Sequence, residues 1–271
     1  MNILDEIITV KRTRVAEAMR ARPLDELRET IRLQSLPDTA KTFSRAINAN
    51  GGTRIIAEFK RRSPSKGTIR PGADSATVAR WYEAGGAAAI SVLTEEDFFD
   101  GSLADLQAIR ETVSLPLLRK DFIFDEYQIY ETAIAGADAI LLIAAALNDD
   151  SLRRLRILAE DLGLDALVEV HTRGEMRRAV NSGAKLIGVN NRDLTTFAVS
   201  LDTSIELARE APPGCTLVSE SGLENAIDLN RLGQLGYKGF LIGEWLMKAG
   251  NPEEALRRLL NATHSYASES E

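Results

Sequence analysis

The sequence predicts a (β/α)8 barrel, the TIM-barrel fold, with a helical N-terminal extension. Short apolar runs of strand length alternate with segments of helical periodicity, a pattern typical of parallel strands joined by helices. Four segments repeat a helix end, a glycine and a strand, and these glycines lie 51, 47 and 53 residues apart: Gly85, Gly136, Gly183 and Gly236. Two β/α units occupy about that length, so the array holds eight units. A doubly wound sheet, the alternative, rarely contains eight evenly spaced units.

The elements follow in a regular order. Strands are expected within 84–91, 135–142, 182–189 and 235–242, interleaved with apolar runs at 55–59, 116–119, 166–170 and 216–219. Helices are expected over 74–84, 102–112, 125–135, 149–162, 172–182, 203–210, 223–235 and 252–262, the first with Asp74 or Ser75 as N-cap. Residues 1–271 are predicted to be one domain, in which residues 1–50 are helical and cover one end of the barrel.

Composition narrows the function classes. A net charge of −7 argues against a nucleic-acid partner, and the single cysteine, Cys215, excludes an internal disulfide. Neither His171 nor His264 has a companion at metal-ligand spacing, so we expect no metal site. The N-terminal segment has acids within its apolar stretch, unlike a secretory signal, and no run reaches the ~20 apolar residues of a membrane span. We therefore expect a cytoplasmic protein that does not bind membranes.

Polar side chains follow the apolar runs at their C-terminal ends. Glu58 and Lys60 lie two apart at the end of the first strand, so they point to one face, where an acid and a base are costly unless they meet each other or a ligand. In a barrel all strand ends converge on one face. We therefore predict one pocket ringed by Glu58, Lys60, Lys120, Glu169, Asn190 and Ser221.

Two further groups suggest what the pocket binds. Gly222 and Gly243 follow the last two strands, where barrels commonly bind phosphate through backbone N–H groups. Phe98-Phe99 and Phe122 place aromatic rings beside the same pocket. Together they predict a ligand with an aromatic or apolar body and a phosphate tail. Arg192 either holds an anion or pairs with Asp193.

As a set and in this order, the segments between residues 55 and 247 closely resemble the indole-3-glycerol phosphate synthase family of tryptophan biosynthesis. The matching segments are IIAEFKRRSPSKG, SVLTEEDFFDGS, PLLRKDFIFDEYQI, GADAILLI, ALVEVH, IGVNNRDL, VSESGL and FLIGEWLM. Other phosphate-binding barrels share the last two motifs but not the EFK, RKDF and VEV combination.

The resemblance implies a decarboxylating lyase that acts on 1-(2-carboxyphenylamino)-1-deoxyribulose 5-phosphate and needs neither cofactor nor metal. It implies that Lys120 is the general acid, that Glu169 is a general base, and that Glu58 and Lys60 bind the substrate and move protons in dehydration. The other implied catalytic residue is Asn190. The residues implied to bind substrate are Arg192, Ser221, Ser63, Phe99, Phe122 and Leu141, and those implied at the phosphate are Gly222, Gly243 and Glu244.

Two expectations about this site follow. Only the N–H of Glu244 is expected to help the phosphate, because forms of the family have a small hydroxyl residue there. A lysine serves as an acid if burial or a neighbouring cation lowers its pKa. We expect Lys60 and Lys120 to affect each other in this way, with the effect tempered by Glu58 and Glu169.

Two other functions remain open. A phosphoribosylanthranilate isomerase would share the aromatic and phosphate pockets but is expected to use a cysteine and an aspartate. A non-catalytic phosphosugar-binding protein would lack the acid and the base. The expected partner is a small phosphorylated substrate. The chain is expected to be a monomer or weak homo-oligomer, with contact to other tryptophan-pathway enzymes left open.

Overall fold

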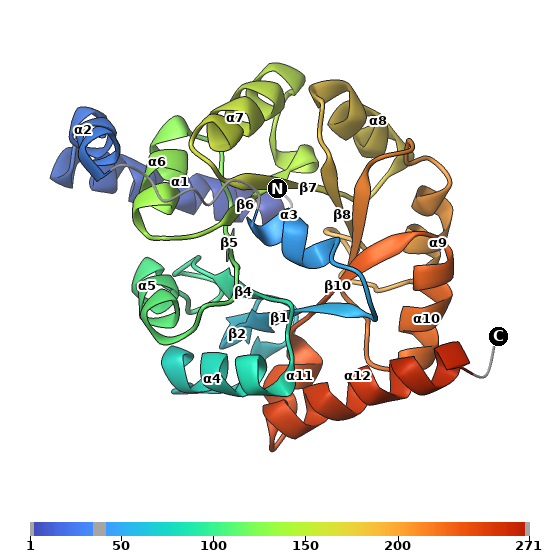
Figure 1. The fold of residues 1–271 in the computed structure, drawn as a ribbon. Helices are drawn as coiled ribbons and strands as arrows, with labels where there is room; N and C mark the ends of the chain where they lie inside the picture. Colours follow the sequence, from blue (N-terminus) through green and yellow to red (C-terminus); the bar gives the residue numbers. More distant parts are fainter. Residues whose placement is uncertain (1–2, 35–41, 269–271) are drawn as a thin grey trace.

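Eight parallel strands close into a barrel, which confirms the predicted fold class (Figure 1). The computed structural model describes residues 3–34 and 42–268. Around the barrel the strand order is β1-β10-β9-β8-β7-β6-β5-β4, so each strand lies beside its sequence neighbour and the sheet has no free edge. The strands are β1 Arg54–Phe59, β4 Ala89–Leu93, β5 Leu117–Lys120, β6 Ala139–Ile143, β7 Asp165–Val170, β8 Leu186–Asn190, β9 Thr216–Glu220 and β10 Tyr237–Ile242.

Helices surround the barrel, and their termini follow the capping residues of the sequence. Asp74, Ser102 and Asp125 each accept a backbone N–H of the first helical turn, and Gly86 and Gly183 end their helices in the left-handed region. The outer helices are α4 Ser75–Gly85, α5 Leu103–Thr112, α6 Glu126–Ile134, α7 Asp149–Asp161, α8 Arg173–Ser182, α9 Asp202–Ala208, α10 Ala226–Gln234 and α12 Pro252–Ser268.

Three short elements at the strand ends were not predicted as separate elements. The cationic loop after β1 forms an antiparallel hairpin, β2 Arg62–Ser63 with β3 Gly67–Thr68. A 3-10 turn, η1 Ala144–Ala146, follows β6, and a short helix, α11 Glu244–Lys248, follows β10. All three follow the C-terminal ends of their strands, where loops of a barrel build the binding site.

Alternation along each strand divides the core into two layers. Ile55, Ala57 and Phe59 of β1 pack in the larger apolar cluster, which includes buried helix residues, whereas Ile56 packs in the smaller interior cluster. Leu118, Leu167 and Val218 hold the equivalent interior positions on β5, β7 and β9. The residue two positions after each of these therefore faces inward at the C-terminal end of the barrel.

The N-terminal extension reaches both ends of the barrel, not one end as predicted. Phe43 and Ile47 of α3 (Thr42–Ile47) are buried in the interior cluster, so α3 closes the end where the strands begin (Figure 1). Ile3 and Ile7 of α1 (Ile3–Ala21) instead line a cavity at the opposite end. Helix α2 (Leu24–Gln34) packs against α6. An apolar stripe on α1 thus lines the cavity at the C-terminal end of the barrel.

Within residues 3–34 and 42–268, no helix combines the length and the hydropathy needed to cross a lipid bilayer.

Candidate active site

A cavity of about 560 Å³ opens at the C-terminal end of the barrel. Its wall combines strand ends with the loops after β1, β4, β5, β8 and β9 and with helices α1 and α11. All the residues that the family resemblance implies for the site line this cavity: Glu58, Lys60, Ser63, Phe99, Lys120, Phe122, Leu141, Glu169, Asn190, Arg192, Ser221, Gly222, Gly243 and Glu244. The structure therefore brings the predicted residues together, and their individual roles remain predictions.

The floor of the cavity is a cluster of buried charges. The Nζ of Lys120 lies 3.0 Å from Oε2 of Glu169 and 2.9 Å from Oε2 of Glu220. Lys60 forms a short ion pair with Glu58 beside them. Strand parity explains the convergence, because Glu58, Lys120 and Glu169 each follow an interior apolar residue by two positions. Three carboxylates thus face two ammonium groups.

Glu220 lines the cavity and binds Lys120, but it was not among the site residues predicted from the sequence. It follows Val218 by two positions, the same spacing as Leu118 to Lys120, and that spacing was the available signal. Its Oε1 is buried and has no hydrogen-bond partner within residues 3–34 and 42–268, and Glu220 itself lines the cavity. Space for it depends on Gly188, where a Cβ would lie only 2.1 Å from Oε1 of Glu220.

The predicted lowering of the Lys120 pKa is wrong. Burial lowers this pKa, but the opposing attraction of Glu169, Glu220 and Glu58 outweighs burial and raises it. Lys60 does not supply the expected repulsion, because Glu58 pairs with it directly. Lys120 is therefore a fully charged ammonium that donates hydrogen bonds to two carboxylates.

The two carboxylates that bind Lys120 differ in their protonation. Burial raises the pKa of Glu169, but Lys120 and His171 outweigh it and hold this pKa below the usual value. Burial raises the pKa of Glu220, and the negative charge of Glu169 raises it further. The attraction of Lys120 lowers this pKa by less, so the net value is about 7. Near neutral pH the cluster thus contains an ionised Glu169 and a Glu220 that exchanges a proton.

A stability measurement tests this assignment. A carboxyl group whose folded-state pKa is raised costs stability that grows as the pH rises above the unfolded-state pKa and reaches its full size above the folded-state pKa, and the cost is absent below the unfolded-state pKa. Glu220→Gln mimics the neutral acid, so it should raise the unfolding free energy at pH 8.5 by up to about 3 kcal/mol. At pH 4.5 parent and variant should be equally stable. Denaturant unfolding at both pH values checks this, and a variant less stable than the parent at pH 8.5 contradicts it.

Asn190 connects the charge cluster to the loops. Its Oδ1 accepts hydrogen bonds from the Arg192 backbone N–H at 3.0 Å and from the Ser221 hydroxyl at 2.9 Å. Its side chain also hydrogen-bonds Glu169. Ser221 has a φ of 68° and Gly222 a φ of 76°, a strained turn for the serine that aims its hydroxyl at Asn190. Asn190 is thereby placed to orient Glu169.

The predicted phosphate end has a cationic rim and one acid, the predicted Glu244. The Glu244 carboxylate binds Lys248 at 2.6 Å and lies 3.9 Å from Nζ of Lys66 and 4.0 Å from Nη2 of Arg192. The Glu244 side chain is therefore held in ion pairs. Gly243 has a second reason to be glycine, because a Cβ there would lie 2.3 Å from Oε1 of Glu58.

Two aromatic rings form the apolar side of the cavity. The centroids of Phe99 and Phe122 are 6.0 Å apart with an interplanar angle of 39°, a favourable tilted arrangement. The buried carboxylate of Glu95 accepts the backbone N–H groups of Phe98 and Phe99 and so holds the loop after β4. Phe98 itself does not line the cavity, contrary to the prediction.

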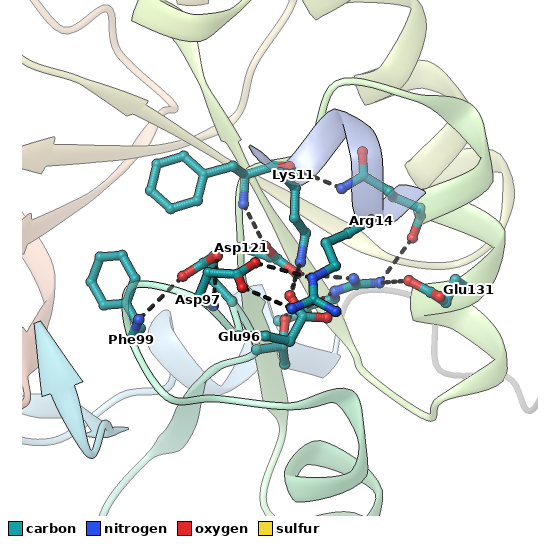
Figure 2. Close-up of polar contacts among 12 residues, drawn as sticks. Lys11, Arg14, Glu96, Asp97, Phe99, Asp121 and Glu131 are labelled. Atoms are coloured by element: carbon teal, nitrogen blue, oxygen red, sulfur yellow. Dashed lines mark hydrogen bonds and ion pairs between the residues drawn. The ribbon is translucent and has the colours of Figure 1, made fainter. Parts of the chain in front are cut away.

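Helix α1 is fastened to this side by buried and exposed ion pairs (Figure 2). Nζ of Lys11 lies 2.8 Å from Glu96 and 2.9 Å from Asp121, and only 3% of its side chain is exposed. Arg14 binds Asp97 in a bidentate pair at the surface. Asp121 stands between Lys120 and Phe122 in the chain, so Lys11 connects α1 to both walls of the cavity.

Removing the Lys11 charge should weaken both stability and substrate binding. Lys11→Met leaves Asp121 and Glu96 without this cation, and breaking a buried pair costs about 3–5 kcal/mol, less here because Arg119 still binds Asp121. We expect a lower melting temperature and a higher KM with kcat little changed, since the apolar wall shifts and the charge cluster does not. Arg14→Met is the matched control, because its exposed pair contributes little. Equal effects of the two variants would contradict a special role for Lys11.

Comparison of the sequence with known proteins shows the family to which the chain belongs. The family model described as indole-3-glycerol phosphate synthase matches residues 4–259. The chain belongs to the indole-3-glycerol phosphate synthase family. A relative of that name from Carboxydothermus hydrogenoformans is 47% identical, over 95% of this chain and 99% of its own. One from Nocardioides sp. is 49% identical, over 96% of this chain and 98% of its own.

The solved structures support the fold alone. The 3-hexulose-6-phosphate synthase of Salmonella typhimurium matches with a TM-score of 0.62 over 79% of this chain and all of its own, at 13% identity. At that identity the likeness extends to the barrel and not to its chemistry. Membership of the indole-3-glycerol phosphate synthase family therefore rests on the sequence relatives.

Proposed function

We propose that this protein is an indole-3-glycerol phosphate synthase. It converts 1-(2-carboxyphenylamino)-1-deoxy-D-ribulose 5-phosphate into indole-3-glycerol phosphate, carbon dioxide and water, a step of tryptophan biosynthesis. The observation that carries the proposal is the Lys120 ammonium held between Glu169 and Glu220 inside a cavity with an aromatic wall and a cationic rim. The substrate has matching parts: a carbonyl to be protonated, an aromatic ring and a phosphate.

In the ring closure, the aromatic carbon that carries the carboxylate attacks the ribulose carbonyl carbon. Negative charge develops on the carbonyl oxygen, and Lys120 stabilises it and donates a proton. A lysine with a raised pKa serves here, because the developing alkoxide is more basic than an amine. Loss of carbon dioxide then breaks the bond between the ring and its carboxylate and restores an electron pair to the ring system.

Dehydration requires removal of a ring proton and departure of a hydroxyl group as water. Glu169 is ionised and is the proposed base, and Asn190 orients it. The ammonium of Lys60, paired with Glu58, is the proposed proton donor to the leaving hydroxyl, and Lys60 regains its proton from Glu169, which took one from the ring. Glu220 exchanges a proton near neutral pH and is a proposed relay between Lys120 and solvent in the cavity.

The remaining residues are proposed to hold the substrate. Phe99, Phe122 and Leu141 contact its aromatic ring, and Ser63 and Arg192 contact its polar groups. Ser221, Gly222, Gly243 and the N–H of Glu244 are proposed to bind the phosphate at the strained turn after β9 and at the start of α11. Lys66 and Arg192 supply positive charge at this end.

One assay tests the function directly. Purified protein should produce indole absorbance and fluorescence from the carboxyphenylamino substrate, with release of one carbon dioxide per indole. The dephosphorylated substrate should bind more weakly, and inorganic phosphate should compete with the substrate. Absence of indole product from a folded protein would overturn the proposal.

The isomerase alternative loses support from the position of the cysteine. Cys215 is the only cysteine of the chain and lies just before β9, at the strand's opposite end from the cavity. Its thiol contacts the Ala184 carbonyl oxygen at 3.6 Å. Isomerisation of phosphoribosylanthranilate by this chain would therefore lack the expected thiol, and the same preparation should show no such activity.

We further propose a single domain over residues 1–271 that works in the cytoplasm on a small phosphorylated substrate, as a monomer or weak homo-oligomer. Sedimentation of the full chain measures its oligomeric state.

A further inference from the structure

A histidine lies behind the proposed base, outside the cavity wall. The His171 backbone N–H donates to Oε2 of Glu175 at 2.8 Å, and Nδ1 of its ring lies 3.2 Å from the same oxygen. Nε2 lies 3.4 Å from Oε1 of Glu169. This Nε2 is buried and has no hydrogen-bond partner among the described residues. The ring is thus clamped at one nitrogen and aims the other at Glu169.

The surroundings of the ring are strongly acidic. Three glutamates interact electrostatically with the ring: Glu169 on β7, Glu175 on α8 and Glu220 on β9. The positive charge of His171 also lowers the pKa of Asp193, in the loop after β8. Glu169 also forms an ion pair with a second cation, Lys120 on β5. Burial lowers the pKa of His171, but Glu175, Glu169 and Glu220 together outweigh burial and raise it.

We propose that His171 is a positioning residue that acts through Glu169: clamped by Glu175, its imidazolium keeps the Glu169 carboxylate ionised and aimed at the cavity as the pH falls. The inference rests on the proposed role of Glu169 as base. Two cations then flank this carboxylate on opposite sides, Lys120 from the cavity and His171 from behind. His171 touches no cavity space, so its effect reaches the substrate only through Glu169.

The sign of the effect follows from charge. Below its own folded-state pKa, His171 is positive and opposes protonation of Glu169. Above that pKa the ring is neutral, but Glu169 is then ionised in any case. Loss of the ring should therefore harm turnover at low pH and spare it at high pH.

Kinetics of His171→Gln provide the first test, because glutamine keeps a donor near the Nε2 position without the charge. The ratio of kcat at pH 4.5 to kcat at pH 8 should fall below the parent ratio, because loss of the charge should move the acidic limb up by about half a unit, a threefold change at pH values well below its midpoint. Arg173→Gln is the matched control, since it removes an exposed cation from the start of α8 that does not face Glu169. Its ratio should equal that of the parent. An equal loss at all pH values, accompanied by a lower melting temperature, would show a structural role and overturn the proposal.

Titration of the ring by NMR is the second test and needs no activity. The chain has two histidines, so the signal absent from His171→Gln identifies His171. Its midpoint in the parent should lie above that of a free histidine and should fall in Glu169→Gln, with a smaller fall in Glu220→Gln. An unchanged midpoint in Glu169→Gln would overturn the coupling. If the parent makes no indole product, the proposed function fails while this titration still decides the coupling. Should His171→Gln not fold, the midpoint in Glu175→Gln, which should also fall, replaces it.

Discussion

Lys120→Met should reduce turnover by about 10²–10⁴-fold, the contribution of a positioned general acid. The variant removes the ammonium group that, among the residues the structure describes, alone donates hydrogen bonds to both Glu169 and Glu220. The fold should survive, because the two carboxylates line the cavity and take up a proton between them once the ammonium is gone.

Single-turnover absorbance of the indole product measures this loss, and circular dichroism checks the fold. Lys185→Met is a suitable control, because that lysine is exposed before β8, at the end of the barrel away from the cavity. Turnover of Lys120→Met within threefold of the parent would remove Lys120 from the mechanism. A pH series adds information: since the pKa of Lys120 is raised, the parent should show no alkaline loss of activity from this group at pH 8–9.

Glu169→Gln should lower turnover by about 10²-fold or more with substrate affinity little changed. Glutamine keeps the shape and the hydrogen bond to Asn190 but cannot accept a proton. A role in scaffolding would give the opposite pattern, with weaker binding or lower stability and a nearly intact rate. Steady-state kcat and KM, measured together, separate these two patterns.

The complication at Glu169 is its contact with Lys120, 3.0 Å away. In the variant, Glu220 and Glu58 still raise the pKa of Lys120, so the lysine should stay protonated and the alkaline limb should not move. A lost acidic limb supports the base, whereas a shifted alkaline limb supports tuning of Lys120. Glu206→Gln, an exposed acid of α9, is the control for a general loss of negative charge. Normal turnover with an unshifted profile would exclude Glu169 from the catalytic set.

The sequence by itself determined the barrel and most of the residues that line its cavity. Apolar runs with a spacing of about 50 residues between repeated glycines require eight β/α units, and a closed parallel barrel places all strand ends together. Glu58, Lys60, Lys120 and Glu169 were predictable for that reason, because each stands at the end of its apolar run. Their convergence needs only the topology, which local patterns encode.

Only the tertiary structure decided how those charges share their protons. Glu220 was missed because choosing between it and Ser221 requires knowing which side chain of β9 faces inward. The direction of the Lys120 pKa was predicted wrongly, because it depends on how many carboxylates lie within about 3 Å of one ammonium, a balance of burial against attraction that no single segment contains. The prediction that residues 1–50 cover one end of the barrel was likewise wrong, since an amphipathic pattern shows that a face is buried but not against what. Lys11 and Asp121 are far apart in sequence, and their contact exists only once the barrel has closed.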